Sequence, residues 1–195
     1  MKNILSIILI SGFLFSWSNK NKRYHIDETT SPNDTLTFLR TDMSLINGVI
    51  YSKYGEIGSF VNGKKDGLCR KYDKNGKLIK HGNYILGKEE GFIKKYDVNG
   101  QLIEKEFYKN GKKDSTHYSY YGNGQLRQML FFVNDKIEGL SKSYHENGKV
   151  HKEINYVNGK KEGESKQYYD NGQLKLEENY LEFLIFFDAQ LDVLI

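Results

Sequence analysis

The chain has 195 residues with a formal net charge of +4, from 29 basic and 25 acidic residues, and is long enough for one ordinary domain. The evenly mixed charge excludes the concentrated basic patch that nucleic-acid binding requires. Fifteen Tyr, 11 Phe and 19 Gly favour strands and turns over helices. The single cysteine, Cys69, excludes an internal disulfide, and in a strand it is expected to be a small packed side chain rather than a redox group.

The first residues have the pattern of a secretory signal. Lys2 gives a positive start, residues 4–15 are apolar, and Ser16 and Ser18 supply small side chains before a cut. We therefore predict a cleaved signal peptide over residues 1–18 and export to the periplasm, the cell envelope or the medium. A buried first strand and an uncleaved anchor are the alternatives.

Residues 19–44 are polar and include the only proline, Pro32. This composition predicts a linker or a disordered lead into the rest of the chain.

A period of 24 residues organises residues 45–180. The period is visible in two interleaved series, Asn75, Asn99, Asn123, Asn147 and Asn171, and Asn62, Leu86, Asn110, Asn134 and Asn158. Each unit reads as two short strands and two turns. The predicted fold is all-β: an elongated single-layer antiparallel sheet of tandem 24-residue β-hairpins.

Side-chain parity suggests the form of the turns. A three-residue loop at Lys74-Asn75-Gly76 pairs Tyr72 with Leu78 and keeps apolar side chains together, which predicts a bulged hairpin. We expect the same loop at Val61-Asn62-Gly63. With an even period, the even-numbered face should then carry the aromatic columns, among them Phe60, Tyr72, Leu78, Tyr84, Phe92, Tyr96 and Tyr108. The odd-numbered face should be mostly polar with an apolar centre.

The units resemble a known family. The segment "YVNGKKEGESKQYYDNGQL" (residues 156–174) is similar to the MORN-repeat variant found in tandem in bacterial proteins of the YwqK-type antitoxin repeat family. The segment "LINGVIYSKYGEIGSFVNGKKDG" (residues 45–67) resembles the shorter first unit of such proteins. The resemblance implies a twisted single-layer sheet that serves as a scaffold or contact surface.

Two features depart from this pattern. A secretory signal is unexpected for an antitoxin that neutralises a cytoplasmic toxin. The apolar tail at residues 181–195, "LEFLIFFDAQLDVLI", breaks the repeat abruptly. It is either a cap on the last open strand or sequence acquired by a frame change.

No catalytic pattern emerges from the polar residues. His145 and His151 are predicted to be neighbours, but they lack a third metal ligand, and we predict no metal, no cofactor and no enzymatic activity. The acidic column Asp66, Glu90, Asp114, Glu138 and Glu162 runs beside the lysine column Lys64, Lys88, Lys112, Lys136 and Lys160, and we expect a solvated salt-bridge ladder there.

The sequence therefore predicts an exported, non-enzymatic repeat scaffold that binds a protein partner through an extended face. The expected contact residues form the apolar centre of the odd-numbered face: Ile93, Ile103, Phe107, Met129 and Phe131. Two alternatives are an antitoxin or immunity protein that neutralises one toxin, and an envelope module that contacts lipid headgroups.

Overall fold

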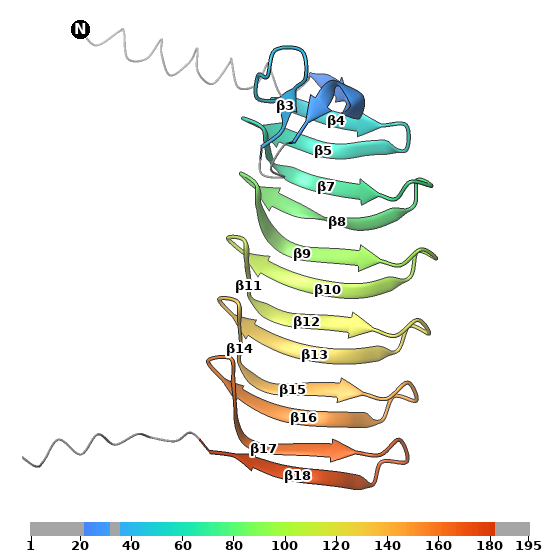
Figure 1. Cartoon of the computed structure of the whole chain (residues 1–195), viewed down its shortest axis with the longest axis vertical. Helices are drawn as coiled ribbons and strands as arrows, with labels where there is room; N and C mark the ends of the chain where they lie inside the picture. Colours follow the sequence, from blue (N-terminus) through green and yellow to red (C-terminus); the bar gives the residue numbers. More distant parts are fainter. Residues whose placement is uncertain (1–21, 32–35, 182–195) are drawn as a thin grey trace, which may run out of the picture.

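The computed structural model describes residues 22–31 and 36–181, and in them one hairpin follows another as the rungs of a ladder (Figure 1). Ten strands of a 12-stranded sheet run in the order β18-β17-β16-β15-β13-β12-β10-β9-β8-β7, all antiparallel, with β11 and β14 paired to β10 and β13. The predicted all-β sheet of tandem hairpins is confirmed. The signal segment at residues 1–18, the tail from residue 182 onward and Pro32 lie outside the described residues.

The elements have the following bounds. They are β1 (Arg23–His25), the 3-10 helix η1 (Ile26–Glu28), β2 (Thr29–Thr30), β3 (Phe38–Leu39), β4 (Gly48–Ser52), β5 (Gly55–Val61), β6 (Lys64–Lys65), β7 (Gly67–Tyr72), β8 (Leu78–Ile85), β9 (Lys88–Tyr96), β10 (Leu102–Lys109), β11 (Lys112–Lys113), β12 (Ser115–Tyr120), β13 (Leu126–Val133), β14 (Lys136–Ile137), β15 (Gly139–Tyr144), β16 (Val150–Val157), β17 (Lys160–Tyr168) and β18 (Leu174–Tyr180).

The turn that joins the two strands of a unit has the predicted three-residue form. Tyr72 pairs with Leu78, and the Asp73 amide donates to the Lys77 carbonyl at 2.9 Å. Gly76 adopts a φ of 85°, which only glycine reaches without strain. The Asp73 carboxylate accepts from the amides of Asn75 and Lys77, which fixes the loop.

The turn that joins one unit to the next is different, and the prediction for it was wrong. Val61 pairs directly with Lys64, so Asn62 and Gly63 form a two-residue loop. Both have positive φ, 49° and 71°, as a type I′ turn requires. This turn suits the right-handed twist of the two flanking strands, so no third loop residue is needed.

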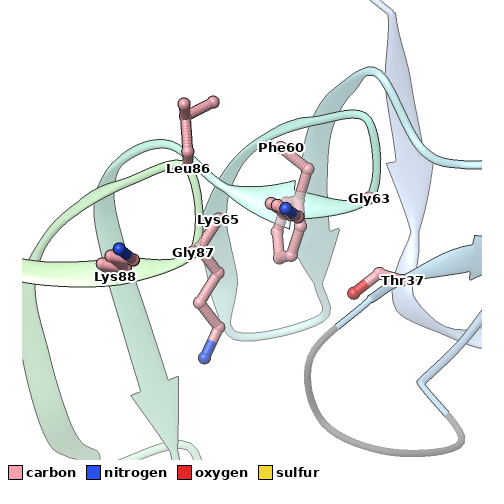
Figure 2. Close-up of a pocket in the computed structure, with 8 residues that line it drawn as sticks. Thr37, Phe60, Gly63, Lys65, Leu86, Gly87 and Lys88 are labelled. Carbon is pink, nitrogen blue, oxygen red and sulfur yellow. The ribbon is translucent and has the colours of Figure 1, made fainter. Parts of the chain in front are cut away.

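Leu86 occupies the first position of such a turn, where the other units have asparagine, and its φ is 48°. Figure 2 shows its side chain standing off the turn beside Gly87, and it is 58% exposed. A left-handed backbone strains leucine by about 1 kcal/mol, whereas asparagine tolerates it. We therefore expect Leu86→Asn to raise the free energy of unfolding by about that amount in urea denaturation. Leu68→Asn, in strand β7, is the matched control and should bring no gain; equal effects of the two substitutions would contradict the explanation.

A bulge in every hairpin decides which side chains share a face. Lys71 pairs with Lys80 although Tyr72 pairs with Leu78, so Ile79 is an extra residue without a cross-strand partner. Beyond the bulge, odd positions of the first strand therefore face even positions of the second. We call this side the inner face, represented by Cys69, Tyr84, Ile93, Glu106 and Ser119. The opposite side is the outer face.

The predicted even-numbered face is therefore corrected. Tyr72 and Leu78 lie on the outer face, but Tyr84 pairs with Gly67 and lies on the inner face. The physical reason is the extra residue, which shifts the alternation of side chains by one position within each unit. The column of Tyr72 and the column of Tyr84, which the sequence analysis assigned to one face, thus lie on opposite faces of the sheet.

The inner face is the better covered side. The residues of the long sheet that are almost fully buried all lie on it: Cys69, Tyr84, Ile93, Glu106, Ser119, Ser141 and Ser165. At Gly82 an added Cβ would lie 2.2 Å from the Ile93 side chain, so the two strands approach closely there. The core of this sheet is thin because a single layer has no second layer to pack against.

Neighbouring units are held together at both edges by contacts between turns. At one edge the amides of Gly87, Gly111, Asp135 and Gly159 donate to backbone carbonyls of the preceding unit at 2.7–2.9 Å. At the other edge, the Asn147 amide nitrogen Nδ2 donates to the Asp170 carbonyl at 2.8 Å and Lys149 Nζ to the Asn171 carbonyl at 2.8 Å. Such contacts couple each unit to the next one.

The acidic column takes part in this stacking and does not form the expected salt-bridge ladder. Glu90 accepts from the amide of Asn110 at 2.7 Å, and Glu138 from that of Asn158 at 2.8 Å. In the part of the chain that the structure describes, no residue of the acidic or lysine columns forms an ion pair. The carboxylates accept hydrogen bonds from open turn amides because these are fixed donors, whereas exposed lysines remain hydrated.

The polar segment before the repeats is folded, which corrects the prediction of a linker or disordered lead for residues 22–31 and 36–44. Strand β1 pairs in parallel with β4, with Arg23 opposite Val49 (Figure 1). Thr37 donates to the Gly63 carbonyl at 2.8 Å, over the first type I′ turn. Tyr24, Leu39 and Ile57 pack against a core cluster of Ile46, Ile50 and Phe60. The segment therefore covers the first edge of the ladder, which would otherwise be open.

Candidate interaction surface

The five predicted contact residues do not form one patch. Ile93 is completely buried on the inner face, where it packs with Cys69 and Tyr84. Ile103 lies in the bulge between Leu102 and Glu104 and has no cross-strand partner. Phe107, Met129 and Phe131 do share the outer face, because they pair with Phe92, Tyr118 and Thr116. The prediction for Ile93 and Ile103 is corrected by the same bulge that divides the columns.

The outer face carries an exposed apolar cluster, which we call the outer patch: Phe92, Phe107, Met129, Phe131 and Leu140. The rings of Phe92 and Phe107 meet edge to face with centroids 5.1 Å apart. Phe92, Phe131 and Leu140 are 45%, 42% and 43% exposed. The sequence analysis did not include Phe92 and Leu140 among the contact residues because they have even numbers. Each lies in the first strand of its unit, where even-numbered side chains point to the outer face.

Beside the outer patch, basic side chains follow one another across four strands. Arg70 pairs with His81, His81 with Lys94 and Lys94 with Lys105. We call these four residues the basic row. Lys105 Nζ lies 4.1 Å from the centre of the Phe92 ring, which joins the row to the patch.

Charges in the same line of the sheet are compensated farther along. Lys142 Nζ lies 2.7 Å from Glu153 Oε1, and Lys166 Nζ lies 2.8 Å from Glu164 and 3.4 Å from Glu177. The basic row has only one such contact in the described residues, at 3.9 Å between Arg70 and Glu56. The positive potential of the outer face is therefore concentrated at the strands β7–β10.

The inner face contains a charged cluster that the sequence analysis missed. Glu106, whose side chain is 3% exposed, lies 2.6 Å from Lys113 Nζ and 3.1 Å from Lys95 Nζ. His117 Nδ1 lies 3.2 Å away, without the alignment of a good hydrogen bond. Burial raises the pKa of the Glu106 carboxyl, but contacts with His117, Lys113 and Lys95 outweigh it and hold the pKa well below its usual range.

This cluster has a sequence signal in retrospect. The positions 24 and 48 residues on from Glu106 hold Leu130 and Ile154, so two of the next units have an aliphatic side chain where this unit has a carboxylate. A charged residue at such a position needs partners, and both lysines come from neighbouring strands. Glu106 and the two lysines therefore form an ion-pair cluster that crosses three strands.

The remaining candidates for chemistry are inert or incomplete. Burial raises the pKa of the Cys69 thiol to about 11, so it stays protonated at neutral pH. The rings of His145 and His151 are 4.6 Å apart, but no group of three or more potential metal ligands occurs among the residues that the structure describes.

One hollow of about 240 Å³ lies between the first two type I′ turns (Figure 2). It is lined by Thr37, Phe60, Gly63, Lys64, Lys65, Leu86, Gly87 and Lys88. The lining contains no carboxylate, histidine or cysteine, and its polar side chains are three lysines and Thr37. The hollow has no arrangement that supports catalysis.

Comparison with known families agrees with the repeat architecture. A family profile described as "MORN repeat variant" matches residues 65–85, 90–110, 113–134, 137–158 and 161–182, which together make up more than half of the chain. The matches begin in β6, so the hairpin β4–β5 lies before them. No curated protein matches the sequence. In the described part of the chain, no helix has the length and apolarity needed to cross a membrane.

Proposed function

The chain belongs to the MORN repeat variant family and is a repeat scaffold, and from this premise we propose that it is a non-enzymatic protein that binds a partner protein through the outer face of its sheet. The observation that carries this proposal is the outer patch. It exposes two phenylalanines and a leucine over neighbouring strands, and the rings of Phe92 and Phe107 are in contact. A contiguous exposed apolar patch with a polar border is typical of a protein interaction site.

Aromatic anchors supply most of the binding energy in such interfaces. We therefore expect the double substitution Phe107→Ser and Phe131→Ser to weaken partner binding by about 2 kcal/mol or more, a loss of at least about thirtyfold in affinity. The measurement is capture of partners by the tagged full chain from its own cells, followed by titration of the captured protein against each variant.

The matched control is the double substitution Leu174→Ser and Leu176→Ser, which removes exposed apolar side chains of the terminal strand β18, away from the outer patch. A protein retained by the wild type and this control but lost by the outer-patch variant supports the proposal. A partner that all three chains retain equally would contradict it. Capture of lipid alone would favour the envelope module instead, and a single toxic partner would give the role of an antitoxin.

We also propose that the protein is exported, on the basis of its first 18 residues. Mass spectrometry of the protein from its own cells tests this. A mature N-terminus near residue 19 in an extracytoplasmic fraction supports export, and an intact Met1 in the cytoplasm contradicts it.

A further inference from the structure

The basic row combines charges that repel one another. Lys94 and Lys105 face each other directly on adjacent strands, and neither forms an ion pair in the described residues. Like charges in such cross-strand positions destabilise a sheet. The pKa of His81 is lowered, first by burial and then by the charges of Lys94 and Arg70, which is consistent with a positive potential at this place.

The acidic residues near the basic row do not compensate it. Glu104 and Glu106 flank Lys105 in sequence, but they lie on the inner face, where both contact Lys95. Asp97 accepts from the amides of Asn99 and Gln101 in its own turn, and Glu90 accepts from the Asn110 amide. The same line of the sheet is neutralised farther on by Lys142–Glu153 and Lys166–Glu177. The missing carboxylates are therefore a property of β7–β10 and not of the repeat in general.

The spacing of the basic row indicates which shape of partner could supply the missing carboxylates. Adjacent strands are about 4.8 Å apart, so the basic side chains follow one another at about this distance across the sheet. On an α-helix, side chains at i, i+4 and i+7 are about 5–6 Å apart, which is a close match. An extended segment repeats its side chains on one face every ~7 Å, which does not match.

The outer patch lies next to the basic row, and both run across the strands of the sheet. Phe92 and Lys94 are two residues apart on β9, and Phe107 and Lys105 on β10, so the apolar and basic lines are about 7 Å apart. A helix lying across the strands would meet both lines with two adjacent stripes. From β7 to β13 there are five steps between strands, or about 24 Å, which a helix of about 16 residues spans.

From this arrangement we infer that the partner presents an amphipathic helix with an acidic stripe beside an apolar stripe, and that this helix lies across strands β7–β13 on the outer face. The inference rests on the proposed function and specifies the partner of the same surface. The acidic stripe meets the basic row, and the apolar stripe meets the outer patch from Phe92 on β9 to Phe131 on β13.

The test uses a fluorescent alanine-based helical peptide of about 16 residues with a glutamate stripe beside a leucine stripe. Its affinity for the full chain is measured by anisotropy, together with a scrambled peptide of equal composition. The variant is Lys94→Glu with Lys105→Glu. Because both residues change together, the facing pair keeps its like-charge repulsion and the fold is not selectively penalised. The control is Lys88→Glu with Lys112→Glu, which changes net charge equally at exposed positions where strands β9 and β11 begin.

We expect the striped peptide to bind at least about tenfold more tightly than the scrambled one, and the basic-row variant to lose at least about tenfold while the control loses less than about threefold. Equal binding of both peptides, equal losses in both variants, or absence of binding would overturn the inference. So would binding to vesicles containing phosphatidylserine with no binding to the peptide. If a captured partner depends on Phe107 and Phe131 but not on Lys94 and Lys105, the proposed function stands and this inference fails.

Discussion

Replacement of Glu106 by alanine is expected to lower the free energy of unfolding by about 2 kcal/mol, because it removes the almost fully buried carboxylate that Lys95 and Lys113 share. The loss is smaller than for a fully buried pair, since Lys95 keeps Glu104 at 2.6 Å and the side chains of Lys95 and Lys113 are 36% and 33% exposed. Urea denaturation followed by circular dichroism measures the loss. Glu153→Ala, which removes the half-buried partner of Lys142, is the matched control and should cost less than about 1 kcal/mol.

The same cluster makes a prediction about pH. The pKa of Glu106 is lower in the folded chain than its ordinary value of 4.5, so the unfolded chain binds the proton more readily. The stabilisation is therefore fully present above about pH 4.5 and is lost as the pH falls toward the folded pKa. The difference in unfolding free energy between the wild type and Glu106→Gln should shrink as the pH is lowered from 5 toward about 2.

Glu106→Gln also keeps the test informative if the alanine variant does not fold. It preserves the shape of the side chain and one acceptor for Lys113, so the chain should fold with a smaller loss. A difference between the wild type and this variant that stays constant with pH would mean that the charge of Glu106 does not stabilise the sheet.

Removal of one complete unit is expected to be tolerated much better than removal of half a unit. Deleting residues 123–146 joins Gly122 to Asn147 and restores the turn, both strand types and the stacking of turns at each edge. Deleting residues 135–146 removes one strand and its connection, so every later turn changes to the opposite edge of the sheet. The bulged turns that carry the contacts Asn147–Asp170 and Lys149–Asn171 would then lie at the edge where the preceding units have type I′ turns. Unlike turns would therefore be stacked at both edges.

We expect the half-unit deletion to melt at least about 5 °C below the whole-unit deletion, which corresponds to about 2 kcal/mol in a chain of this size. Thermal unfolding monitored by circular dichroism provides the measurement. Equal melting temperatures would mean that the stacking of like turns contributes little to the coupling between units. A whole-unit deletion that failed to fold would show that the units are not interchangeable.

The sequence alone determined the repeat and its most local geometry. A spacing of 24 residues identified the units, their two strands and their two turns, since turn residues and strand residues differ in what their backbones tolerate. The three-residue loop at Asn75-Gly76 was predicted because the pairing of Tyr72 with Leu78 depends only on a few adjacent residues. The family resemblance rested on these same local phrases.

The tertiary structure alone decided which side chains share a face. The bulge at Ile79 has Ile103, Arg127, His151 and Lys175 at the same position in later units, so no residue type marks it. One unmarked extra residue reverses the parity of all that follows it in the strand, and it placed Ile93 in the core and Phe92 on the surface. Glu106 and its lysines are likewise brought together only by the register of three strands. Turn lengths, bulges and side-chain packing along the whole sheet together set which residues pair across strands. A local sequence pattern does not contain this information.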